Sequence, residues 1–96
     1  MEEYEVRELL EKTNFPFLAA YHNEWINADR KRISFDEMGK SYLKNCYKML
    51  QKQRYSIEHG FFLAGVEYDK EQYDEIVDIT NRLYNDKMEE IKNYLK

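Results

Sequence analysis

Apolar residues recur at three- and four-residue steps along the last third of the chain, which is the spacing of one face of an α-helix. They run from Tyr73 to Leu95, and Asp69 with Gln72 forms a capping pair just before them. The pattern predicts one helix over about residues 69–95, roughly 40 Å long at 1.5 Å per residue. Such a helix either packs along its whole length on its own chain or leaves part of its apolar stripe free for a partner.

A short amphipathic helix is predicted over about residues 2–12, with acids in its first turn, where the helix dipole favours them. A second is predicted over about 36–58 from the stripe of Leu43, Cys46 and Leu50. Ser34 with Glu37 is the capping box expected at its start, with Ser41 as the fallback cap, and Gly60 is its expected stop.

The segment between these helices is harder to classify. Residues 16–25 read as helix or strand; helix is favoured, because Phe17, Tyr21 and Trp25 would line one face. Residues 25–35 have two short β-prone ends around a polar loop, 28–31, and predict a hairpin. "FFLAGVEY" is the most apolar stretch and is predicted to lie in the core.

These elements predict a mainly α fold with a small β-hairpin, a compact helical domain ending in a long amphipathic helix. The 96 residues suffice for a single domain. The longest uncharged runs fall far short of the roughly 20 apolar residues that cross a bilayer, so no membrane contact is expected. Cys46 is the single cysteine. We therefore expect no internal disulfide, a buried thiol and a cytoplasmic protein.

The net charge of −4 conceals strong segregation. Residues 1–29 hold seven acids and two bases, residues 30–54 hold eight bases and two acids, and residues 67–78 hold six acids and one base. A pI near 5.2 argues against general binding of duplex nucleic acid. The basic middle segment is the local exception.

A ladder of lysines at every fourth position stands out in this basic segment: Lys40, Lys44, Lys48 and Lys52. This pattern has three possible interpretations. The ladder is a solvated helix face; or it is paired with acids of the last helix, within the chain or across a homo-oligomer; or it is an anion site. In the third interpretation it joins Arg30, Lys31 and Arg32, and Tyr47 or Tyr55 offers a ring on which a base stacks.

Two interpretations fit the acids in the first turns of the last helix, which are Glu71, Asp74, Glu75 and Asp78. They follow the preference of the helix dipole for acids near its start. Alternatively they form a partner-binding acidic face, which mimics phosphates and blocks a nucleic-acid groove on another protein.

No complete catalytic, cofactor or metal motif is found. "GFFLAG" has the glycine spacing of a phosphate loop, but Val66 and Glu67 stand where Lys and Ser or Thr are needed. His22 and His59 lack metal-ligand neighbours at helical spacing, and a pair of Cys46 with His59 has no orienting third group. The sequence therefore predicts a non-enzymatic protein without cofactor or metal.

The block from Trp25 to Leu50 resembles one in small phage and prophage proteins. Those proteins show a Trp, a polar turn, an Ile-x-Ile-like strand leading to a Met, and a helix reading Ser-His-Leu-x-Asn-x-x-x-Met-Leu. The counterparts here are "W", "NADRKR", "ISF", "EM" and "SYLKNCYKML", with Trp25, Ile33, Phe35, Met38, Ser41, Leu43, Asn45, Met49 and Leu50 in step. Tyr42 replaces the His, which puts any role of an imidazole there in doubt.

The resemblance implies a viral or mobile-element origin and a hairpin followed by a helix. It also implies a stoichiometric binder of a host protein in the bacterial cytoplasm, an inhibitor of a defence or nucleic-acid enzyme of the anti-CRISPR kind. The alternatives are a binder of nucleotide or single-stranded nucleic acid that uses the lysine ladder, and a structural homo-oligomer.

Overall fold

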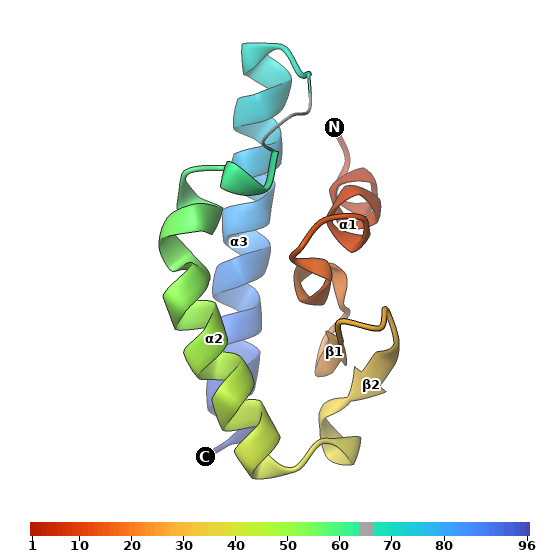
Figure 1. Ribbon diagram of the computed structural model, residues 1–96, viewed down its shortest axis with the longest axis vertical. Coiled ribbons are helices and arrows are strands. Elements are labelled where there is room, and N and C mark those ends of the chain that lie inside the picture. The colour runs from red at the N-terminus through yellow and green to blue at the C-terminus, as the bar shows by residue number, and fades with distance from the viewer. Residues whose placement is uncertain (64–66) are drawn as a thin grey trace.

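One long helix, α3 (Lys70–Tyr94), runs along the longest dimension of the molecule (Figure 1). The computed structural model describes residues 1–63 and 67–96, and its principal extents are 41 × 23 × 20 Å. α2 (Lys40–Glu58) lies antiparallel to α3, and the N-terminal third, which begins with α1 (Glu3–Glu11), packs on the other side. The predicted mainly α fold with a small hairpin and a long C-terminal helix is confirmed.

α3 begins as its sequence predicts, because the Asp69 side chain accepts a hydrogen bond from the Gln72 main-chain N–H at 2.8 Å. Its inward face is buried from Ile76 to Ile91. The apolar stripe therefore packs on its own chain, and the alternative of a projecting, unpartnered stripe is wrong for this stretch.

The predicted start of the middle helix is wrong. Residues 35–37 form a 3₁₀ turn, η2 (Phe35–Glu37), and α2 begins at Lys40, with Gly39 as N-cap rather than Ser34 or Ser41. Phe35 and Met38 are both buried, and Met38 has extended backbone angles. Anchoring both side chains in the core therefore delays the helix. At the other end Gly60 adopts the left-handed φ of 70° expected of a helix stop.

The helix favoured for residues 16–25 is also wrong. The chain makes a single 3₁₀ turn, η1 (Pro16–Ala19), and then turns into strand β1 (Glu24–Ile26). The Arg7 guanidinium explains this, since it donates hydrogen bonds to the carbonyls of Ala19 and Ala20 at 3.0 and 2.7 Å. These carbonyls therefore accept hydrogen bonds from Arg7 of α1 rather than from the N–H groups of a further helical turn. Phe17, Tyr21 and Trp25 consequently share no helical face.

The hairpin pairs β1 with β2 (Arg32–Ser34) in antiparallel register, with Trp25 opposite Ile33. The Asn27 side chain accepts the N–H groups of Asp29 and Lys31 at 2.9 and 3.0 Å, which fixes the turn.

After α2 the chain forms the 3₁₀ turn η3 (Phe61–Leu63), where Leu63 is buried. Residues 64–66 of the predicted core stretch lie outside the described residues. At its end Glu67 is exposed, which contradicts the prediction there, and Tyr68 is half-buried. Within the described ranges, no helix is both long and apolar enough to cross a membrane.

Candidate functional site

An unbroken line of exposed charged side chains follows one side of α3. Its members stand three or four residues apart, so they share a face of the helix. They are Glu71, Glu75, Asp78, Arg82, Asp86 and Glu89, all exposed, and we call them the acidic stripe. At 1.5 Å per residue the stripe is about 27 Å long. Three of the four acids predicted from the sequence belong to it. Asp74 is rotated about 100° away from its neighbour Glu75.

The N-terminal segment packs beside this stripe and brings one acid, Glu3, and one cation, the Met1 amino group. The Met1 amino nitrogen lies 2.9 Å from the Glu75 carboxylate, and Arg82 forms an ion pair with Glu3. The single base of the stripe is therefore neutralised by α1. Segments from opposite ends of the sequence thus meet beside the stripe, because α1 packs on α3. In the described part of the chain four of the stripe's acids form no ion pair: Glu71, Asp78, Asp86 and Glu89.

The stripe ends in a hollow of about 560 Å³ between α3 and the loop before β1. It is lined by His22, Asn23, Asp86, Glu89, Glu90, Asn93 and Tyr94. Asp86 and Glu89 are exposed and form no ion pair within residues 1–63 and 67–96. They are free to bind a cationic group. Glu90 differs, because it accepts the Asn23 N–H at 2.8 Å and pairs with Lys87 at 2.9 Å.

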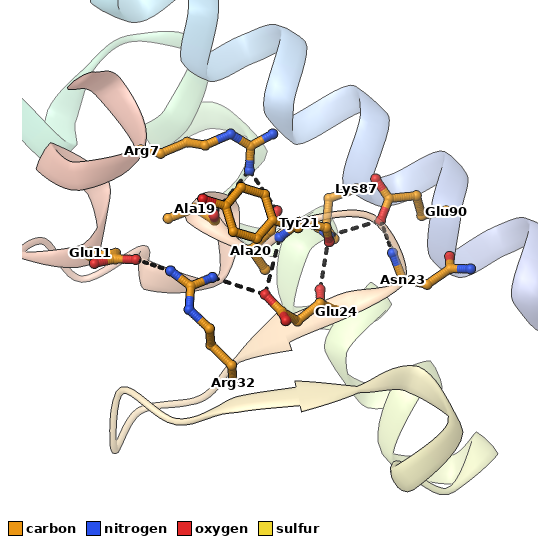
Figure 2. Close-up of polar contacts among 10 residues, drawn as sticks. All are labelled: Arg7, Glu11, Ala19, Ala20, Tyr21, Asn23, Glu24, Arg32, Lys87 and Glu90. Atoms are coloured by element: carbon orange, nitrogen blue, oxygen red, sulfur yellow. Dashed lines mark hydrogen bonds and ion pairs between the residues drawn. The ribbon is translucent and has the colours of Figure 1, made fainter. Parts of the chain in front are cut away.

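Lys87 holds the wall of this hollow in place. Its side chain is 2% exposed, and its ammonium nitrogen donates hydrogen bonds to the carbonyls of Tyr21 and Glu24 and to the Glu90 carboxylate (Figure 2). Burial lowers the pKa of Lys87, while the hydrogen bond and the charge of Glu90 oppose that shift. The loop of residues 21–24 is therefore fixed to α3 by a buried, fully bonded cation.

Two arginines fix the same loop from its outer side. The guanidinium groups of Arg7 and Arg32 lie 5.2 and 5.1 Å from the centre of the Tyr21 ring, which is a cation–π distance. Arg32 also pairs with Glu11 and Glu24. Its charge is thus used inside the fold, whereas the sequence placed it in an anion site.

The predicted anion site is only partly assembled. All four lysines of the ladder are exposed, and none forms an ion pair in the described part of the chain. The acids of α3 therefore do not pair with them there. Arg30 donates a hydrogen bond to the carbonyl of Thr13, and Lys31 is exposed in the hairpin turn. Tyr47 lies instead in a hollow of about 240 Å³ with Lys92, Leu95 and Lys96.

Sequence reasoning missed Asp86, Glu89 and Glu90. The three- and four-residue spacing that links Glu71 to Asp78 continues to Asp86 and Glu89, so a helical projection of the last third identifies the whole stripe. Glu90 carries no such pattern, because its role depends on the loop that packs on it. Among the described residues, no cluster of His, Cys, Asp and Glu side chains could hold a metal ion.

Comparison of the chain with protein families, with curated proteins and with solved structures gave no match.

Proposed function

We propose that this protein is a non-enzymatic binding protein whose acidic stripe docks on the basic surface of a partner protein. The observation that carries the proposal is the stripe itself, which has five exposed carboxylates along one side of α3. Of these only Glu75 is paired in the described structure, with the Met1 amino group, and the single base, Arg82, is paired with Glu3. Single exposed ion pairs contribute little affinity. A predominantly anionic row of about 27 Å instead steers association and selects a partner of opposite charge.

A nucleic-acid enzyme has the surface expected of such a partner, because these enzymes carry extended basic grooves that bind phosphates. A carboxylate row offers the same sign of charge on a folded scaffold, so occupancy of the groove would exclude the nucleic acid. The resemblance to phage and prophage proteins supports a search in bacterial hosts, with inhibition of a defence enzyme as the biological outcome.

The test compares two triple variants with equal loss of charge. The stripe variant carries Glu71→Gln, Asp78→Asn and Glu89→Gln, and the control carries Asp29→Asn, Glu37→Gln and Asp74→Asn, which lie off the stripe. All six side chains are exposed and unpaired within the described ranges, so both variants should fold. Each protein is immobilised and exposed to bacterial lysate at rising salt concentration.

We expect wild type and control to retain the same basic protein at low salt and the stripe variant to lose it. The purified partner should then bind in a fixed stoichiometry by calorimetry, at least tenfold more weakly to the stripe variant. Equal retention by the stripe variant would refute the role of the stripe.

A second candidate is binding of nucleotide or single-stranded nucleic acid at the basic side. It is favoured by the exposure of the four ladder lysines and by the hollow in which Tyr47 meets Lys92 and Lys96. Anisotropy of a labelled oligonucleotide should then rise on binding and fall with added salt, and Lys44→Ala with Lys48→Ala should weaken the binding. Oligonucleotide binding that is unaffected by salt and by the two lysine substitutions would exclude this candidate.

A further inference from the structure

A second hollow, of about 360 Å³, lies between the hairpin and α2, away from the acidic stripe. We call it the Trp25 hollow. Four segments supply its walls: the loop after α1 with η1, strand β1, the hairpin turn and α2. Its lining residues are Asn14, Pro16, Phe17, Trp25, Ile26, Asn27, Ala28, Tyr42, Asn45, Cys46 and Met49. Its volume falls in the range of small-molecule sites, roughly 300–1,000 Å³.

None of the lining residues is charged, although 35% of the residues in this chain are. The one titratable thiol, that of Cys46, is neutral at pH 7, because burial raises its pKa to about 11. A charged ligand would lose hydration there without meeting an opposite charge. The lining therefore selects an uncharged ligand.

Aromatic rings make part of this wall flat and rigid. Trp25 and Phe17 are 3% and 7% exposed, and their rings stack with centroids 4.8 Å apart and planes 6° from parallel. Trp25 is held by its pairing with Ile33 across the hairpin. The stack leaves little of either ring open, so it stiffens the wall, and a planar ligand packs on the more exposed Tyr42 and Met49 that line the same hollow.

Side-chain amides at the edge add polar groups. Asn14 and Asn45 are exposed, and within residues 1–63 and 67–96 their amides form no hydrogen bond. Each amide offers both donors and an acceptor. A few polar groups around an apolar wall are the usual makeup of a small-molecule site.

We propose that the Trp25 hollow binds an uncharged, planar heteroaromatic small molecule, independently of the acidic stripe. The ring packs against Tyr42 and Met49, beside the largely covered Trp25, and its heteroatoms bond to Asn14 or Asn45.

Trp25 is the only tryptophan of the chain, so its indole N–H gives a single peak in a ¹⁵N–¹H spectrum. The probe is indole, and indole-3-acetate is the charged counterpart of the same ring. We expect indole to shift the Trp25 peak saturably, with a Kd below about 1 mM, which corresponds to about −4.1 kcal/mol. Indole-3-acetate should bind at least tenfold more weakly.

Ala28→Phe fills the hollow from an exposed turn position, and Asp29→Phe places the same ring at the next residue, which does not line it. Dispersed amide spectra establish that both variants fold. Indole should bind Asp29→Phe as it binds wild type and bind Ala28→Phe at least tenfold more weakly. The absence of a saturable shift, equal binding to Ala28→Phe, or tighter binding of indole-3-acetate would each overturn the proposal.

Discussion

Lys87 donates a hydrogen bond from its ammonium nitrogen to the main-chain carbonyl of Tyr21, 66 residues earlier in the chain, at 2.8 Å. This contact joins the last helix to the loop that leads into the hairpin. Because the same nitrogen also binds the Glu24 carbonyl and the Glu90 carboxylate, a side chain that is usually solvated becomes part of the core.

Lys87→Met should destabilise the fold by about 3–5 kcal/mol, since two carbonyls lose their donor and the Glu90 carboxylate loses its ammonium partner. Among the described residues, that carboxylate then keeps only the Asn23 N–H and the more distant His22 ring. Lys92→Met, at an exposed position later in the same helix, should change the free energy of unfolding by less than about 0.5 kcal/mol. Urea denaturation measures both. The double variant Lys87→Met with Glu90→Met should cost less than the sum of the single changes, because neither charge is then left alone. Strict additivity would contradict the coupling.

Gly60→Ala should destabilise the protein by about 1–3 kcal/mol. Gly60 has a φ of 70°, and a Cβ there would collide with the Tyr73 hydroxyl and with Val77. Gly39→Ala is the matched change, because its φ is −68° and no atom lies within 4 Å of an added Cβ. Its cost should stay below about 1 kcal/mol, the usual difference at an N-cap. Equal melting temperatures for the two variants would disprove the steric argument.

Thr80→Val should leave stability unchanged or raise it by up to about 1 kcal/mol. The Thr80 hydroxyl is buried and finds no hydrogen-bond partner in the described structure, so its removal relieves a desolvation cost. Thr13→Val should lower stability by about 1–2 kcal/mol, because that hydroxyl donates to the Leu10 carbonyl and accepts the Phe15 N–H. Thermal unfolding of both variants distinguishes the two hydroxyl environments. A large loss of stability for Thr80→Val would contradict the prediction, because it would mean that the Thr80 hydroxyl forms a hydrogen bond.

Lys44→Glu should stabilise α2 by roughly 0.8–2 kcal/mol. It replaces two like-charge pairs, with Lys40 and Lys48, by two opposite pairs worth about 0.2–0.5 kcal/mol each. All three side chains are exposed, so packing should not change. Lys44→Gln should give about half the gain. Chemical denaturation at low and high salt tests whether the added stability is electrostatic, since that added stability should shrink as salt screens the charges.

The Cys46 thiol should make stability fall at alkaline pH. Its pKa is raised from 9.0 to about 11 by burial, so the unfolded chain loses this proton first. The contribution is fully present below pH 9 and is lost as the pH rises through 11. Between these values the free energy of unfolding should drop more steeply for wild type than for Cys46→Ala. Parallel curves for the two proteins would rule out this role.

Local patterns determined several parts of this fold. The helix period and the Asp69 cap set α3, alternating β-prone ends set the hairpin, and Gly60 marks the end of α2. Part of the acidic stripe follows in the same way, because residues spaced three and four apart share a face of any α-helix.

Only tertiary packing decided the rest. Arg7 binds the carbonyls that a helix after Pro16 would have used. The anchoring of Phe35 and Met38 moves the start of α2 past the predicted cap Ser34 to Lys40. Lys87 has the same sequence character as the exposed lysines of the ladder, yet it is buried. Its environment consists of carbonyls from the loop of residues 21–24, more than sixty positions away, and the spacing of residues along one helix carries no information about such a partner.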